Sequence, residues 1–301
     1  MNLITDWQSS RKMNHGRVIT YFIYTKPKVW GLLVFVAAIG AFLALNETRS
    51  GSISLLILSI GAVALGSAGA ESITNYIDYD IDSIMQRTNQ RPLVTGAIPR
   101  LRGLSFGLIL ASLSIILLIV FGRFYASLFM ITGILDNVLV YSYFLKRRTP
   151  WSVILGGFSG GFPVLVGWFT VSDLFSPIPW FLFTLVVVWI PIHIWSLAYR
   201  YKEDYARANI PMLPVVFSDS TTATCISFSA VLLVLFAVLP YFFGVESNYY
   251  LISVLSFSVP LVYYSLDFIG NPSRKSSFAL FKYSSPYLAV VFILFLLFKT
   301  I

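Results

Sequence analysis

The chain has little charge, little histidine and almost no cysteine. Only 11% of its 301 residues are charged, whereas soluble domains carry about 25%, so a soluble globular protein and a disordered chain are both excluded. Cys225 is the single cysteine, which excludes an internal disulfide and a multi-cysteine metal site. The two histidines, His15 and His193, argue against a histidine-rich zinc or di-haem site.

Long apolar runs dominate what is present, at 57% hydrophobic residues. Runs of about 20 residues match the length of helix that crosses a bilayer, and they are too long for barrel strands. We therefore predict an all-α, polytopic membrane protein with a polar cytoplasmic leader at 1–26 and a single transmembrane domain at 27–301. The nine predicted spans are approximately 27–46, 53–73, 101–121, 124–145, 152–171, 179–198, 222–243, 249–268 and 284–300.

The basic residues predict the orientation. Successive loops lie on alternating sides of the membrane, and 18 of the 21 lysines and arginines fall in the loops of one side. Lys and Arg near span ends stay mainly on the cytoplasmic side, so we expect a cytoplasmic N-terminus and an outer C-terminus. The net charge of +8 then reflects topology and attraction to anionic lipid, and no nucleic-acid motif accompanies it.

A first acidic cluster follows the second span. Glu71, Asn75, Asp78 and Asp82 are spaced four, three and four apart, so they share one face if that helix continues past Ser72. Two carboxylates one turn apart repel each other unless a cation bridges them. Hard oxygen ligands of this kind suit Mg²⁺, which usually completes its shell with waters and substrate phosphates.

Arg87 and Arg91 follow this cluster within the segment QRTNQRPL at 86–93. Guanidinium groups bind phosphate through paired hydrogen bonds, so carboxylates, metal and arginine together describe a diphosphate site. The alternative is a solvated helix end with ordinary ion pairs. Ionisable groups at membrane depth are costly and usually functional, which favours the site.

A second cluster, YRYKEDYAR at 199–207, follows the sixth span on the same predicted side. It fits either a salt-bridged surface turn or the opposite wall of one cavity. His193, near the end of that span, either bonds a neighbouring helix or faces the cavity as a proton-handling group. We interpret Asp136 and Asn137, in the middle of the fourth span, as interhelical polar contacts.

Four segments together resemble the UbiA-type intramembrane prenyltransferases, and within them the branch that farnesylates haem. They are TKP at 25–27, DYDIDSIMQRTNQRPLVTG at 78–96, KRRTPW at 146–151 and KEDYARANIPMLPVV at 202–216. The acidic motif is typical of the whole superfamily, whereas the last segment is more specific. Glu71 and Thr74 stand where the family commonly has asparagines.

The resemblance implies a nine-transmembrane-helix bundle around a central cavity. The implied reaction transfers farnesyl from farnesyl diphosphate to a vinyl group of haem b with addition of water, giving haem O. The cofactor would be Mg²⁺, haem b a substrate, and a haem A synthase or terminal oxidase the candidate protein partner. The implied residues are Asp78, Asp82, His193 and Asp204 for catalysis, Asp78, Asp82 and Asp204 for metal, Arg87, Arg91, Lys146, Lys202 and Arg207 for diphosphate, and Glu71, Asn75 and Glu203 as further cavity residues.

Two other interpretations compete with this one. A related prenyltransferase would use a quinone precursor or a glycerol lipid as acceptor. A secondary transporter would also carry membrane acids and bases, but usually near the bilayer midplane, whereas these clusters lie at one end of the spans.

Overall fold

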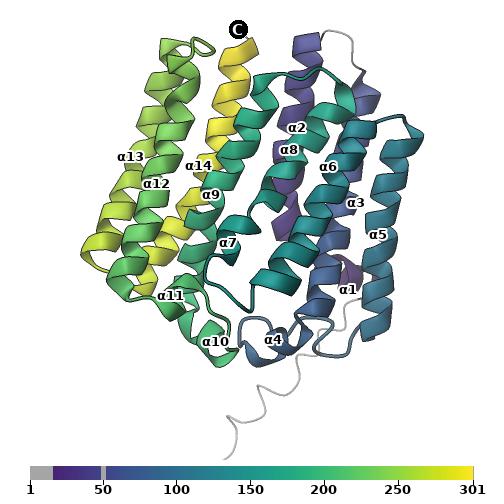
Figure 1. Ribbon diagram of the computed structural model, residues 1–301, viewed down its shortest axis with the longest axis vertical. Coiled ribbons are helices and arrows are strands. Elements are labelled where there is room, and N and C mark those ends of the chain that lie inside the picture. The colour runs from purple at the N-terminus through teal and green to yellow at the C-terminus, as the bar shows by residue number, and fades with distance from the viewer. Residues whose placement is uncertain (1–15, 49–51, 301) are drawn as a thin grey trace, which may run out of the picture.

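The computed structural model describes residues 16–48 and 52–300, and the regular elements of this part are all helices. Nine of these helical segments are long and apolar enough to cross a membrane, and they pack as a bundle (Figure 1). They are α2 (Pro27–Thr48), α3 (Ile53–Ile77), α5 (Arg100–Val120), α6 (Phe124–Leu135) with η1 (Asp136–Leu145), α7 (Ser152–Leu155) with α8 (Phe158–Val171), α9 (Pro177–Arg200), α12 (Asp219–Phe242), α13 (Asn248–Gly270) and α14 (Arg274–Thr300).

The predicted all-α fold and its nine spans are confirmed, with one large difference in a boundary. The last helix begins at Arg274, ten residues before the predicted span at 284. Polar residues such as Lys275 and Lys282 lower the hydropathy of this stretch, yet Leu280 is fully buried. The stretch is therefore a helix with one packed face, which a search for uniformly apolar runs misses.

The short helices α4 (Tyr79–Ile84), α10 (Lys202–Arg207) and α11 (Leu213–Val216) cap one end of the bundle, opposite the C-terminus (Figure 1). The expected polar leader is only partly described. Residues 1–15, with His15, lie outside the described residues, and the remainder forms the mostly apolar helix α1 (Arg17–Tyr24) at the capped end.

The fourth span changes its helical form halfway. Its first half is the α-helix α6, and its second half, η1, is a π-helix that closes with a bond from the Lys146 amide to the Tyr141 carbonyl at 2.8 Å. π-Helical turns are rare and often lie at functional sites. Here the π-helix places Asn137 and Tyr141 on the wall of the central cavity.

Glycines allow the central helices to approach closely. A Cβ atom on Gly167 of α8 would lie 2.1 Å from the carbonyl oxygen of Ala37 in α2. On Gly69 of α3, it would lie 2.5 Å from the amide nitrogen of Ala111 in α5. In both cases the obstacle is backbone, so neither position can accept a side chain unless the helices separate.

Gly167→Ala is therefore expected to lower the free energy of unfolding by about 1–3 kcal/mol, the usual cost of overpacking. Thermal unfolding of the purified protein in detergent measures this. Gly61→Ala is the matched control, because nothing lies within 4 Å of its Cβ position. Equal unfolding temperatures for the two variants would contradict the packing argument.

Candidate active site

The end of α3 carries the first acidic cluster into the capped end of the bundle. Asp78 separates α3 from α4, but the hydrogen bonds continue through it, since the Asp78 amide donates to Thr74 and the Asp82 amide to Asp78. The helical path thus extends past Ser72 as predicted. It leaves Asp78 and Asp82 one turn apart and buried, each 3% exposed.

Each of these two carboxylates is paired with a cation from another segment. Lys146, at the end of η1, contacts Asp78 at 2.5 Å. Arg91 contacts Asp82 at 2.5 Å and donates a second bond to the Asn75 side chain at 3.2 Å. Burial alone would lower the pKa of Lys146, but the negative charge of Asp78 beside it keeps that pKa above its ordinary value. Lys146 therefore stays protonated.

The second acidic cluster meets the first through one residue. Asp204, in α10, accepts a hydrogen bond from the Arg87 amide at 3.1 Å and pairs with the Arg207 side chain. The Arg87 guanidinium lies over the Tyr201 ring, 5.2 Å from its centroid. The two acidic segments are therefore in direct contact at the capped end of the bundle.

Two predicted members of the second cluster lie away from this site. Glu203 is about half exposed and pairs with Arg274 at the start of α14. Lys202 pairs with Asp219 at 2.8 Å. Residues 203 and 204 are adjacent on a short helix, so their side chains diverge, and only Asp204 turns inward.

The three predicted metal ligands do not form a preassembled set. Within the described residues, no three Asp, Glu, His or Cys side chains are grouped closely enough to hold a metal ion. Asp78, Asp82 and Asp204 each have a basic side chain as ion-pair partner instead.

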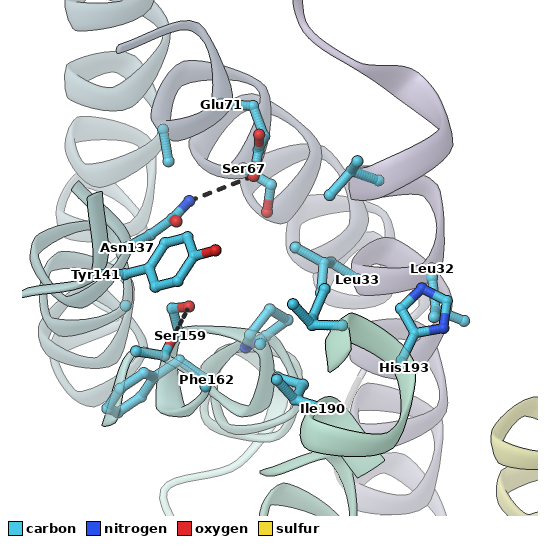
Figure 2. Close-up of a pocket in the computed structure, with 18 of the residues that line it drawn as sticks. Leu32, Leu33, Ser67, Glu71, Asn137, Tyr141, Ser159, Phe162, Ile190 and His193 are labelled. Atoms are coloured by element: carbon cyan, nitrogen blue, oxygen red, sulfur yellow. Dashed lines mark hydrogen bonds between the residues drawn. The ribbon is translucent and has the colours of Figure 1, made fainter. Parts of the chain in front are cut away.

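A cavity of about 800 Å³ opens beside the cluster, within the range of small-molecule sites. Its walls are mainly apolar, with a few polar groups from different helices. Figure 2 shows Ser67 and Glu71 of α3 with Asn137 and Tyr141 of η1 on one side, and His193 of α9 on another.

Among the described residues that line the cavity, Glu71 is the one with an acidic side chain. It is hydrogen-bonded to two other side chains. Its carboxylate accepts hydrogen bonds from Lys26 Nζ at 2.8 Å and from the side-chain amide of Asn137 at 3.4 Å. Lys26 also donates to the Thr74 hydroxyl at 3.2 Å. Burial lowers the pKa of Lys26, and Glu71 opposes that shift. Lys26 has a left-handed backbone, with φ of 56°, a conformation that costs energy in a non-glycine residue.

His193 lines the cavity between two aromatic rings. The Trp189 and Phe281 rings stack on its two faces, each with a centroid separation of 4.4 Å. Its Nδ1 contacts the Ser284 hydroxyl at 2.9 Å, and that hydroxyl donates its proton to the Phe281 carbonyl. The Ser285 hydroxyl lies 3.3 Å from the same nitrogen.

Comparison with known proteins assigns the chain to a family. Residues 33–296 match the UbiA prenyltransferase family. This chain belongs to the UbiA prenyltransferase family. It is 56% identical to the protoheme IX farnesyltransferase of Thermoplasma acidophilum over 94% of this chain and 99% of that protein. It is 54% identical to protoheme IX farnesyltransferase 1 of Picrophilus torridus over 93% of this chain and 94% of that one.

Solved structures share the fold of this UbiA-family chain. A digeranylgeranylglyceryl phosphate synthase superimposes with a TM-score of 0.76 at 20% identity, over 94% of this chain and 99% of that one. A UbiA homolog from Archaeoglobus fulgidus bound to GPP and Mg²⁺ gives 0.66 at 17% identity, over 92% and 99%. These likenesses confirm the bundle architecture.

Three residues of this UbiA-family site, Asn137, Tyr141 and Lys26, were not assigned to it from the sequence. Asp136 and Asn137 were both interpreted as interhelical contacts. Asp136 does make one, to the Ser159 backbone amide at 2.7 Å, whereas Asn137 also lines the cavity. Tyr141 gave no signal, because the π-turn that presents it has no sequence pattern. Lys26 lies in the recognised segment at 25–27, but its partner Glu71 is 45 residues away.

Removing one partner of the Lys26–Glu71 pair is expected to destabilise this UbiA-family protein by about 3–5 kcal/mol, because the other charge stays buried and unpaired. Lys26→Met and Glu71→Gln, singly and together, form a double-mutant cycle read by unfolding in detergent. The exposed Arg147–Asp80 pair is the control, with about 0–1 kcal/mol expected. A Lys26–Glu71 coupling no larger than the control would contradict the prediction.

Proposed function

We propose that this protein transfers a farnesyl group from farnesyl diphosphate to a vinyl group of haem b, with addition of water, to give haem O and diphosphate. The observation that carries the proposal is a buried cluster of carboxylates and cations beside a largely apolar cavity. The cluster suits the charged diphosphate and the cavity suits two apolar substrates. Relatives more than half identical are named protoheme IX farnesyltransferase, which favours haem b as acceptor.

The residues fit Mg²⁺ as cofactor. The Oδ1 atom of Asp78 is buried and has no hydrogen-bond partner among the described residues, which is costly unless a cation or a polar group satisfies it. Mg²⁺ is usually held by one or two carboxylates together with substrate phosphates, so no preformed cage is needed. We assign Asp78 and Asp82 to the metal, with Asp204 on the facing wall. The metal would neutralise charge that develops on the leaving diphosphate.

Cations of the chain share that task. Lys146 and Arg91 are held beside Asp78 and Asp82, and Arg87 lines the cavity. Because Lys146 and Arg91 are fixed in a partly dry site, they stabilise the leaving diphosphate without reorganising. Lys202 and Arg207 do not line the cavity and pair with Asp219 and Asp204, so we place them at the rim, where they attract the incoming diphosphate.

The apolar part of the cavity separates the allylic cation from bulk water until the vinyl group attacks. His193 lies in a wall that also contains Trp189 and Phe281. We assign it to the haem side of the cavity. There its imidazole would accept the proton that the added water loses.

The nine apolar helices and the family indicate a multi-pass membrane protein. We propose the cell membrane, with the N-terminus and the active site on the cytoplasmic side, because 18 of the 21 basic residues belong to loops of one predicted side. We also infer a single prenyltransferase domain over 27–301.

A haem A synthase or terminal oxidase would be the protein partner that receives the haem O.

Asp78→Asn and Asp82→Asn are each expected to lower haem O formation by a factor on the order of 10²–10³, the usual cost of losing a group that stabilises transition-state charge. Mass spectrometry of haems extracted from cells that depend on this protein measures the effect. Asp80→Asn is the matched control, because Asp80 is exposed and pairs with Arg147 outside the cavity. Full haem O production by either buried variant would contradict the assignment.

The acceptor is tested with purified protein, farnesyl diphosphate and Mg²⁺. Haem b is expected to yield haem O by mass, whereas a quinone precursor or a glycerol lipid acceptor yields no prenylated product. Chelation of Mg²⁺ with EDTA should abolish turnover, and added Mg²⁺ should restore it. A prenylated quinone precursor without haem O, or solute uptake by proteoliposomes without diphosphate release, would overturn the proposal.

A further inference from the structure

Helix α1 (Arg17–Tyr24) is fixed to the bundle by one face. The Tyr24 hydroxyl donates to the Ser72 carbonyl of α3 at 2.7 Å, and Tyr24 is 1% exposed. The Tyr21 ring packs edge-on against Phe106 of α5, with centroids 4.8 Å apart. The helix therefore has a defined place against α3 and α5.

The other face of α1 is apolar and exposed. Val18 is 83% exposed and Phe22 53%, and Ile19 and Ile23 are also exposed. Positions 18, 19, 22 and 23 fall on one side of a helix. A cluster of large apolar side chains of this kind marks a surface that is covered in the cell.

The level of α1 along the bundle indicates what covers this face. Phe106, which Tyr21 contacts, is six residues into the spanning helix α5, about 9 Å from its start. Ser72 lies five residues before the end of α3, about 8 Å from that end. At this level α5 also exposes apolar side chains such as Leu108. The apolar face of α1 is thus continuous with the lipid-facing surface of the spans.

The charged residues next to α1 in the sequence have one sign. Residues 16–46 contain no Asp or Glu, while Arg17 and Lys28 are exposed. Arg102, also exposed, precedes Gly103, which lies against the Tyr24 ring. An apolar face bordered by cations is the arrangement that lies in the interface of an anionic bilayer.

We propose that α1 is an interfacial anchor whose partner is an anionic bilayer surface, and that this contact holds the segment after α1 against the active site. The contacts are continuous. The Tyr24 carbonyl accepts from the Asn75 side chain at 2.7 Å, and Asn75 accepts from Arg91, the partner of Asp82. Two residues after Tyr24, Lys26 pairs with Glu71. Lipid bound to α1 thus stabilises the position of Arg91 and Lys26.

The anchor is tested by spin labels on Val18→Cys and Phe22→Cys in a Cys225→Ser background, in vesicles of phosphatidylcholine with phosphatidylglycerol. Both labels are expected to collide more often with oxygen than with a water-soluble nickel complex, as a lipid-facing label on Leu108→Cys does. A label on Ser83→Cys, exposed on α4, is the aqueous control. Accessibility to nickel equal to that at Ser83 would overturn the anchor whatever the protein catalyses.

The coupling to the site, which rests on the proposed function, is tested with the double variant Val18→Asp, Phe22→Asp. We expect a rise in the dissociation constant for farnesyl diphosphate of at least about fivefold, the lower end of typical coupling between sites. Replacing phosphatidylglycerol by phosphatidylcholine should also weaken the binding of farnesyl diphosphate to the wild type. The matched control, Val18→Leu with Phe22→Leu, keeps the apolar face and should bind as wild type. Unchanged binding by the aspartate variant would overturn the coupling, whereas failure of wild type to bind farnesyl diphosphate would instead count against the proposed function.

Discussion

Pairing of buried charges organises the capped end of this protein. A buried carboxylate that is left without a partner is costly, because it loses its hydration. Three of them on one continuous helical path, Glu71, Asp78 and Asp82, each take a cation from a different segment. The segment before α2, the loop after α4 and the end of η1 are thereby fixed to α3. The interactions that complete the fold at this end are thus the same ones that gather the groups of the candidate site.

Patterns local in sequence predicted most of this arrangement. Apolar runs predicted the nine spans, and the spacing of Glu71, Asn75, Asp78 and Asp82 predicted a shared face. Interactions between distant segments were not predictable in the same way. Lys26 has no local feature that selects Glu71 as its partner, and adjacent Glu203 and Asp204 are chemically alike until α10 directs one outward and one inward. The start of α14 was missed because a helix with one polar face has low mean hydropathy.

The cavity divides its chemistry between two environments. At the capped end, cations and carboxylates are close together, and the charged groups are neutralised in pairs. Toward the bundle interior the walls are aromatic and aliphatic, with His193 held between two rings and in contact with Ser284 through Nδ1. A reaction that separates an anionic leaving group from an apolar cation needs both environments in contact. The apolar environment could not be recognised from composition, because the aromatic residues that line the cavity are no different in type from those that face lipid.

The π-helix η1 makes the geometry depend on chain length at a single point. A π-turn contains one more residue than the α-turn it replaces. Loss of one residue between Asp136 and Leu145 would allow this stretch to become α-helical while the residues after it keep their direction, because the extra residue is the one that the π-turn absorbs. Asn137 and Tyr141 would then be presented differently to the cavity, whereas Lys146 would stay at the end of the span. An insertion of one residue is therefore a simple route by which an ancestral α-helix could have acquired this cavity wall.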